Sequence, residues 1–233
     1  MSDKIETKAS FVSVIGATNA GKSTLVNMLV GKKISIVSHK VQTTRNQIRG
    51  IMNEHNTQIV FIDTPGIFEP KRALDEAMLR AAWNSLEGVE EILLLIDATH
   101  GLKKSVMAII EKLQNRNLKC LVALNKVDEI KDKKELLLLA QNLNDFGIFK
   151  EIFMISALSG DGVEDIKKYL LENAPNSPWY FADTKYSDIP LAFEAAEITR
   201  EKIYEWCHQE LPYSIAVDTS EITTNADGSL KIN

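Results

Sequence analysis

Residues 16–24 read Gly16-Ala17-Thr18-Asn19-Ala20-Gly21-Lys22-Ser23-Thr24, which is the spacing of a phosphate-binding loop. The apolar stretch 11–15 before it predicts a strand, and residues 24–29 after it have the pattern of an amphipathic helix. The glycines let the backbone approach an anion closely, so that N–H groups and the helix N-terminus face phosphate oxygens. We therefore expect a P-loop nucleotide site, in which Lys22 reaches the β- and γ-phosphates and Ser23 ligates Mg²⁺.

A second motif, Asn125-Lys126-Val127-Asp128, follows the apolar stretch 118–124. The Asp128 carboxylate can accept both the N1–H and N2–H groups of guanine, whereas adenine presents an acceptor at N1. Such a site rejects the wrong base by several kcal/mol, on the order of 10⁴-fold or more. We expect Asn125 to tie this loop to the other edge of the base or to the phosphate loop, and the Lys126 stem to cover the ring.

Two further stretches follow predicted strands and complete the set. Asp63-Thr64-Pro65-Gly66 comes after the strand 59–62, and we expect Asp63 to hold Mg²⁺ through water and Gly66 to bring its N–H to the γ-phosphate. A plain strand-to-turn corner is the alternative, because Asp, Pro and Gly all favour turns. Ser156-Ala157-Leu158 follows the strand 151–155 and could offer backbone N–H groups to guanine O6. The tripeptide alone indicates nothing, and it suggests a base-binding segment only because of its position after this strand.

The alternation of strands and helices predicts an α/β fold of the P-loop NTPase class. Its sheet should be mostly parallel with one antiparallel hairpin and helices on both faces. We expect strands near 10–15, 48–53, 57–63, 90–97, 118–125 and 151–155, and helices near 22–30, 72–86, 102–116, 133–145 and 162–173. A nucleotide-binding domain over 8–173 would be followed by a linker over 174–190. A partial α+β domain over 191–233 would hold a helix near 191–209 and a strand near 213–218.

The composition excludes several other classes. The 233 residues are 45% hydrophobic with a net charge of −5, which suits a globular core and gives no support to binding nucleic acid through overall charge. Two isolated cysteines, Cys120 and Cys207, indicate neither a disulfide framework nor a zinc site, and the four histidines show no metal spacing. The apolar runs are too short to span a bilayer, and no opening stretch resembles a signal peptide, so we expect a cytoplasmic protein.

These motifs, together with Gln42-Thr43-Thr44-Arg45 and the stretches 195–203 and 210–217, resemble the TrmE–Era family of GTPases, and within it the ribosome-assembly members. The resemblance covers essentially the whole chain from about residue 8. It implies that Thr44 closes on Mg²⁺ and that Asn19 helps to hold K⁺ near the phosphates. Together with Lys22 and Gly66, Thr44 forms the expected catalytic set.

The resemblance also implies a slow intrinsic reaction. Ile67 stands where Ras-like enzymes place a glutamine after the Asp-x-x-Gly motif, and it has no polar atom with which to orient water. Thr18 replaces the proline usual at its place in the loop, which costs some rigidity without a clear functional consequence.

The ribosome-assembly members of this family, which the chain resembles, carry a C-terminal K-homology domain that binds the 3′ end of the 16S rRNA in the small ribosomal subunit. Here no Gly-x-x-Gly loop, which clamps the nucleotide backbone in that module, occurs beyond residue 190. Residues 174–233 hold four Lys and Arg against ten Asp and Glu, a net charge of −6. Such a charge repels phosphate. Either the protein is truncated or it has lost the ability to bind RNA, and the sequence leaves both open. We expect this chain to bind GTP but to bind RNA poorly.

Three functions compete at this point. The first is a monomeric GTP-driven switch for small-subunit assembly and 16S rRNA processing, with the peripheral contact to the inner membrane that the resemblance implies. The second is a tRNA-modification GTPase of the same family, which would need a separate modifying domain. The third is an RNA-binding module with a vestigial nucleotide site, which the intact Lys22, Ser23 and Asp63 argue against.

Overall fold

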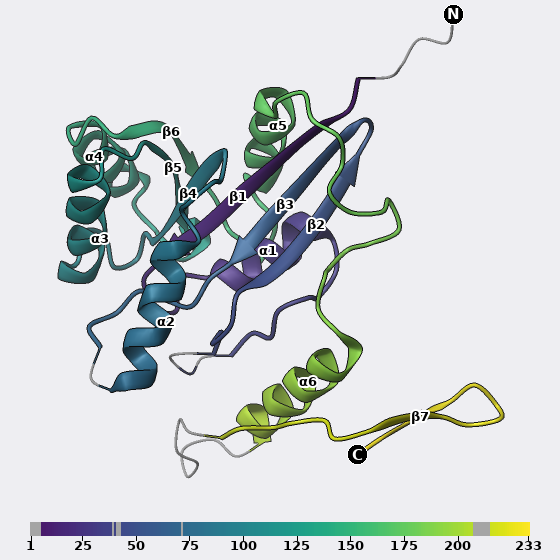
Figure 1. The fold of residues 1–233 in the computed structure, drawn as a ribbon. Helices are drawn as coiled ribbons and strands as arrows, with labels where there is room; N and C mark the ends of the chain where they lie inside the picture. The colour runs from purple at the N-terminus through teal and green to yellow at the C-terminus, as the bar shows by residue number, and fades with distance from the viewer. Residues whose placement is uncertain (1–5, 39, 41–42, 71, 207–214) are drawn as a thin grey trace, which may run out of the picture.

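The computed structural model describes residues 6–38, 40, 43–70, 72–206 and 215–233. Its centre is a six-stranded sheet in the order β2-β3-β1-β4-β5-β6 (Figure 1). The strands are β1 (Lys8–Gly16), β2 (Ile48–Glu54), β3 (Thr57–Asp63), β4 (Glu91–Asp97), β5 (Cys120–Asn125) and β6 (Phe149–Met154). β2 and β3 pair antiparallel and all other neighbours pair parallel, which confirms the predicted fold class.

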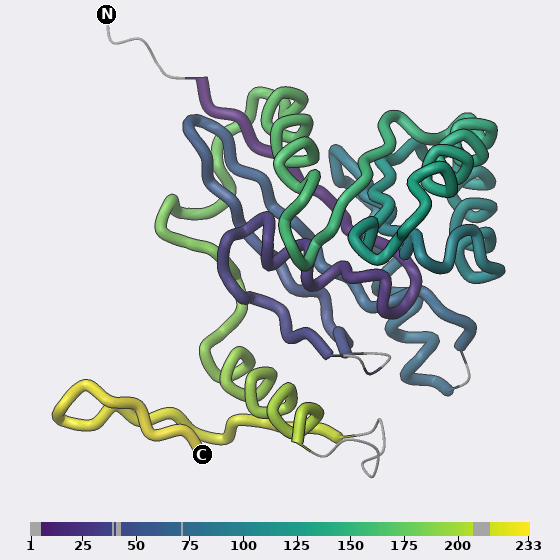
Figure 2. Tube along the Cα trace, turned by 180° about the vertical axis from the view of Figure 1, so that it is seen from behind, coloured from purple at the N-terminus to yellow at the C-terminus, as the bar shows by residue number. Residues whose placement is uncertain are grey.

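Helices cover both faces of this sheet, as its apolar strands require. α1 (Lys22–Val30) and α5 (Val163–Asn173) pack on the face turned toward the viewer in Figure 2. The opposite face is covered by α2 (Ala73–Asn84), α3 (Lys104–Asn115) and α4 (Lys133–Asn144). Successive residues of β4 serve the two cores in turn: Leu93 and Leu95 pack toward α1 and α5, and Leu94 packs toward α2 and α3.

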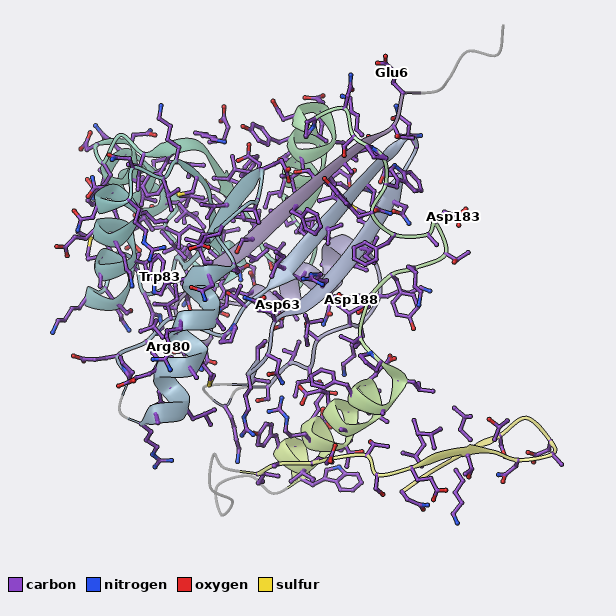
Figure 3. All side chains as sticks on the ribbon, in the orientation of Figure 1. Glu6, Asp63, Arg80, Trp83, Asp183 and Asp188 are labelled. Carbon is purple, nitrogen blue, oxygen red and sulfur yellow. The ribbon has the colours of Figure 1, made fainter. Side chains whose placement is uncertain are left out.

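The strand order brings five strand ends to one edge of the sheet. β1, β3, β4, β5 and β6 all run in the same direction, so their carboxyl ends lie side by side. Open α/β sheets bind ligands at this edge. The predicted motifs therefore meet in space although they are spread over most of the chain, and Figure 3 labels one of them, Asp63, at the end of β3.

Residues 174–190, here named the strap, were predicted as a linker and are bonded along the hairpin of β2 and β3. The side chain of Gln58, fully buried on β3, accepts from the N–H groups of Tyr180 and Phe181 and donates to the Phe181 carbonyl. The Ile51 N–H donates to the Tyr186 carbonyl at 2.9 Å. The strap is thus held to the sheet over its length, while the domain boundaries at its two ends stay predictions.

α6 (Leu191–Trp206) follows the strap and lies below the sheet in Figure 1. It confirms the predicted helix up to Trp206, and residues 207–209 lie outside the described part of the chain. The predicted strand 213–218 is wrong for 215–218, which form no strand, and 213–214 are not described. Local β propensity needs a partner edge, and here β7 (Ile222–Thr224) and β8 (Leu230–Ile232) pair with each other instead.

None of the helices in the described part of the chain has the length and apolarity that crossing a membrane requires.

Candidate functional site

A cleft of about 1640 Å³ opens at the carboxyl edge of the sheet. Most of the predicted site residues line it: Ala17, Thr18, Asn19, Ala20, Gly21, Lys22, Ser23, Thr24, Thr44, Gly66, Asn125, Lys126, Asp128, Ser156, Ala157 and Leu158. The other four, Gly16, Asp63, Thr64 and Pro65, are buried and do not line it. The structure therefore brings together motifs from the ends of β1, β3, β5 and β6.

At Gly21 the phosphate loop packs closely against Asn125, the first residue of the Asn-Lys-x-Asp motif. Gly21 has a left-handed backbone with φ of 97°, and a Cβ there would lie 2.3 Å from the Asn125 amide nitrogen, so no larger residue fits. Lys22 is buried and donates to the loop carbonyls of Gly16 and Ala17 at 3.2 and 3.0 Å. Burial lowers the pKa of Lys22 to about 8, although the Asp63 carboxylate opposes the shift.

The side chain of Asn125 connects three segments of the site. Its amide nitrogen donates to the Ala20 carbonyl of the phosphate loop at 2.8 Å, and its oxygen accepts from the Ala157 N–H at 2.8 Å. Of the two roles expected for Asn125, the contact with the phosphate loop is the one present here. Because the side chain is only 2% exposed, both bonds are shielded from water and set the spacing between the two ends of the cleft.

At the other end of the cleft, Asp128 lies exposed in a short 3₁₀ turn (Val127–Glu129). Lys126 before it has a left-handed backbone with φ of 67°, and its ammonium bonds the Asp97 carboxylate at 2.6 Å. Burial would raise the pKa of Asp97, but hydrogen bonds from Lys126 and Thr99 outweigh burial and hold the pKa below its ordinary value. Asp97 ends β4 and was missed by the sequence analysis.

The predicted metal ligands come together near the start of α1. The hydroxyls of Ser23 and Thr44 share a hydrogen bond of 2.9 Å. Two neighbouring ligands of an octahedral Mg²⁺ ion, each 2.0–2.1 Å from the metal, are about 2.9 Å apart. Asp63 is fully buried, and neither of its carboxylate oxygens has a hydrogen-bond partner among the described residues. Burial raises the pKa of Asp63, although the hydroxyl of Ser23 and the ammonium of Lys22 oppose the shift. A buried carboxylate beside two hydroxyls is an all-oxygen set that fits Mg²⁺.

The segment after Asp63 packs against the phosphate loop. A Cβ on Gly66 would lie 2.7 Å from the side chain of Thr18 and 2.8 Å from its Cα, so this position needs glycine. The Ile67 N–H donates to the Gly16 carbonyl at 2.9 Å, and the Ile67 side chain is buried in the core beneath α2. Its apolar side chain therefore offers the cleft no group that could orient water.

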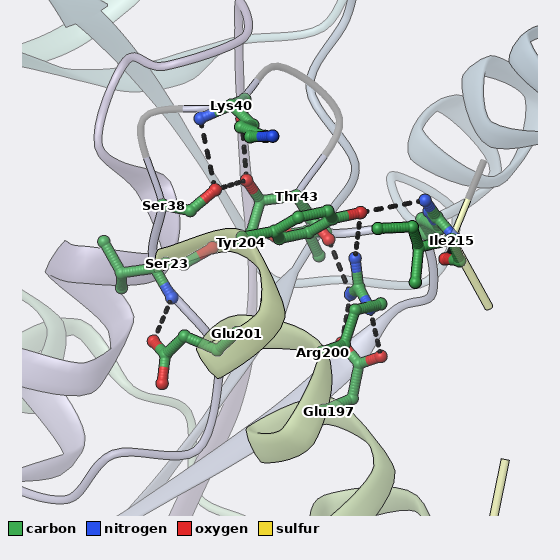
Figure 4. A network of polar contacts seen from close by, with 12 residues as sticks. Ser23, Ser38, Lys40, Thr43, Glu197, Arg200, Glu201, Tyr204 and Ile215 are labelled. Atoms are coloured by element: carbon green, nitrogen blue, oxygen red, sulfur yellow. Dashed lines mark hydrogen bonds and ion pairs between the residues drawn. The ribbon is translucent and has the colours of Figure 1, made fainter. Parts of the chain in front are cut away.

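Segment 33–45, of which 39, 41 and 42 are not described, lies against α6 through charged side chains (Figure 4). The buried Glu201 carboxylate accepts from the Val37 N–H at 2.9 Å and pairs with Lys33 at 2.5 Å. Arg200 donates to the Thr43 carbonyl at 2.7 Å. Tyr204 and Glu205 of α6 also line the cleft. No pattern in the sequence analysis pointed to these contacts.

A glycine-rich loop after β1, an aspartate after β3 and an Asn-Lys-x-Asp loop after β5, all at one sheet edge, define a P-loop GTPase. Residues 11–126 match the profile of a protein family described as 50S ribosome-binding GTPase. The chain is 51% identical over 227 residues to GTPase Era of Brucella suis, covering 97% of this chain and 73% of that protein. It is also 51% identical over 228 residues to GTPase Era of Rhizobium meliloti, covering 98% and 72%. The chain belongs to the Era family of GTPases.

Solved structures agree with this assignment. A crystal structure of Era in complex with MgGDPNP and nucleotides 1506–1542 of 16S ribosomal RNA is 38% identical, with a TM-score of 0.91. It is matched over 97% of this chain and 77% of its own. An Aquifex aeolicus Era variant bound to GDP·AlF₄⁻ gives the same identity, coverage and TM-score.

Proposed function

We propose that this GTPase is a molecular switch that binds GTP with Mg²⁺, hydrolyses it to GDP and phosphate, and acts in assembly of the small ribosomal subunit. The observation that carries the proposal is the double hydrogen bond of Asn125, which joins the phosphate loop to the residues around the base. Lys22 would neutralise charge on the β- and γ-phosphates, and Asp128 would accept the guanine N–H groups.

The residues proposed to hold Mg²⁺ make the conformation of the site depend on the bound nucleotide. The hydroxyls of Ser23 and Thr44 would hold Mg²⁺ directly and Asp63 would hold it through water, and the bound ion would neutralise charge on the phosphates. Thr44 belongs to segment 33–45, so its contact with the metal depends on a nucleotide that keeps the metal in place. Loss of the γ-phosphate would release both Thr44 and the N–H of Gly66.

Hydrolysis should be slow without a partner. Ile67 is buried and apolar at the position from which Ras-like enzymes orient water, so one positioning group is absent from the site. Slow hydrolysis suits a switch, because the GTP-bound state then lasts long enough for a partner to bind.

The guanine preference is tested at Asp128. An asparagine side chain can donate where the carboxylate accepts, so Asp128→Asn should lose affinity for GDP and gain affinity for xanthosine diphosphate, whose 2-oxo group accepts a hydrogen bond. We expect the ratio of the two affinities to change by about 10³-fold or more. The measurement is calorimetric titration with both nucleotides. An unchanged GDP affinity would remove Asp128 from the base site.

The proposed partner is the small ribosomal subunit through the 3′ end of its 16S rRNA. The relative crystallised with nucleotides 1506–1542 supports this choice. The family profile whose description names the 50S subunit matches residues 11–126, which lie before the strap and α6. We give the 16S complex more weight because its match also includes these later elements.

RNA binding by this chain itself should be weak, since residues 174–233 have a net charge of −6. Fluorescence anisotropy with an oligonucleotide of the 16S 3′ end and a GTP analogue would measure it. We expect an affinity at least about 100-fold below that of a full-length Era relative. Comparable affinities would show that the acidic segment does not govern RNA binding.

A further inference from the structure

The Ser35 hydroxyl is a buried polar group without a partner. Ser35 is 1% exposed, and its Oγ makes no hydrogen bond in the described part of the chain. Within that part, the other buried side-chain oxygens in this situation are the two of the Asp63 carboxylate. Such groups are costly to bury and call for a specific explanation. One of the two groups, Asp63, is itself a proposed ligand of the metal through water.

The two groups are neighbours. Burial raises the pKa of Asp63, and the surrounding groups that oppose this shift include the hydroxyl of Ser35 as well as that of Ser23. The Ser35 hydroxyl therefore lies near the Asp63 carboxylate without a hydrogen bond between them, and the Ser23 hydroxyl lies near it from the start of α1. A serine hydroxyl can donate one hydrogen bond to a carboxylate oxygen and leaves the carboxylate's remaining lone pairs for water.

The side chain of Asn27 holds Ser35 in this place. Its Oδ1 accepts from the N–H groups of Ile34 and Ser35 at 2.9 and 3.0 Å, and its Nδ2 donates to the Ser35 carbonyl at 2.8 Å. Both backbone groups of Ser35 are thus bonded to one side chain. Asn27 lies on α1, the helix whose first turn carries Lys22 and Ser23, so the start of segment 33–45 is fixed to the phosphate-binding helix.

We propose that Ser35 is a positioning residue for the magnesium site: its hydroxyl orients the Asp63 carboxylate toward the metal-bound water, and Asn27 sets Ser35 for that role. The inference rests on the proposed Mg²⁺-dependent nucleotide site. It assigns a task to a residue outside the phosphate-loop, Asp-x-x-Gly and Asn-Lys-x-Asp motifs. It also explains why the first residues of segment 33–45 are clamped while Thr44, further along, belongs to the part that responds to nucleotide.

The test measures how Mg²⁺ slows the release of a fluorescent GDP analogue. In Ser35→Ala, the Mg²⁺ concentration for half-maximal slowing should rise about tenfold, because the variant cannot donate the hydrogen bond that the Ser35 hydroxyl would give to the carboxylate in the metal-bound state. Affinity for the analogue in EDTA should stay within about twofold of the wild type, because the phosphate and base contacts remain. Ser177→Ala, in the strap and outside the cleft lining, is the control and should keep the wild-type Mg²⁺ response.

Further variants separate positioning from packing. Ser35→Cys fills the site with a slightly larger side chain that is only a weak donor, and it should behave as Ser35→Ala does, so the test does not depend on one variant folding well. Asn27→Ala should reproduce the shift, and Asn27→Asp, which keeps the two acceptor bonds and loses the donor, should shift less. An unchanged Mg²⁺ response in both Ser35 variants would overturn the role of Ser35, as would an equal loss of affinity in EDTA. A response that changes in the Ser35 variants but not in Asn27→Ala would overturn the role of Asn27.

The wild type separates this inference from the function on which it rests. If the wild type fails to bind GDP, the proposed function is wrong. If the wild type binds GDP with a Mg²⁺ dependence that the Ser35 variants share, the function stands and the inference alone is wrong.

Discussion

The two walls of the nucleotide cleft are held by different kinds of contact. One wall consists of the phosphate loop, residues 125–128 and residues 156–158, all of which directly follow strands of the central sheet. The buried amide of Asn125 links these parts to one another. The other wall is segment 33–45, which is attached through side chains of α1 and α6, among them Glu201 and Arg200 (Figure 4).

This difference shows how one cleft can both recognise a nucleotide and respond to it. Strand ends in a sheet covered on both faces keep their positions, so the first wall is preorganised for base and phosphates. The described residues of segment 33–45 form no strand, and their position depends on a few polar bonds that each contribute little net stability. We therefore expect the first wall to keep its shape through the nucleotide cycle. The part of the second wall beyond Ser35, which Asn27 does not hold, should move together with α6.

Asn125→Ala should break the first wall and have the largest effect. The change removes both bonds and leaves the Ala20 carbonyl and the Ala157 N–H buried without their partner. We expect the free energy of unfolding to fall by about 2–4 kcal/mol. GDP affinity should fall by at least about 30-fold, because the two ends of the site lose their fixed spacing. Urea unfolding and calorimetric titration measure the two quantities.

The control for this variant is Asn142→Ala, on the exposed side of α4. It should change neither stability nor affinity beyond about 0.5 kcal/mol. If Asn125→Ala matched this control, the first wall would owe its shape to the strands alone.

Glu201→Ala should loosen the second wall with a smaller effect. It removes the acceptor of the Val37 N–H and the partner of Lys33, although the exposed Lys33 side chain makes the ion pair worth little. We expect about 1–3 kcal/mol of lost stability from the buried bond. Hydrogen exchange at Val37 should become faster while GDP affinity changes by less than about tenfold.

Lys202→Ala is the matched control on α6, because its ammonium pairs with Glu205 near the surface. It should leave exchange at Val37 unchanged. Equal exchange rates in Glu201→Ala and the wild type would show that segment 33–45 is held by other contacts.

The smallest expected effect is the uptake of a fraction of a proton by Lys22, in the first wall, when the nucleotide binds. The pKa of Lys22 is about 8 in the nucleotide-free protein because burial disfavours the ammonium, and a bound phosphate favours it. The pKa should therefore rise on binding, with uptake of about half a proton at pH 8 and about a tenth at pH 7. Titrations of GDP in EDTA, in buffers of different ionisation enthalpy, give this number.

Lys22→Arg is the comparison here, since a guanidinium stays charged throughout this range. It should show less uptake at pH 8 than the wild type. The same uptake in both proteins would assign the proton to another group.

Much of the fold and of the first wall could be predicted because each motif directly follows an apolar strand. Gly16, Asp63 and Asn125 each end a strand of a mostly parallel sheet, so their meeting at one edge follows from topology. Asp97 could not be recognised in this way. A single aspartate after an apolar strand has no spacing that distinguishes it from an ordinary turn residue.

The second wall could not be predicted, because its contacts join residues that are distant in sequence. Arg200 and Thr43 are separated by 157 positions, and no periodicity links them. The predicted strand 213–218 failed over 215–218 for a related reason: Ile215 and Val217 favour extended structure, but a strand needs a partner that local sequence does not specify. The polar, proline-containing composition of 174–190 likewise indicated only a linker. It could not show the hydrogen bonds to Gln58, because this residue lies on a strand that is distant in sequence.

The strap gives α6 a pivot. Residues 174–190 are fastened to β2 and β3, whose shape the core maintains, whereas the middle of α6 is fastened to segment 33–45. A displacement of segment 33–45 should therefore rotate α6 about its N-terminal end at Pro190, while that end stays attached to the sheet. A shift confined to a few residues beside the phosphates would then change the direction of α6 relative to the sheet.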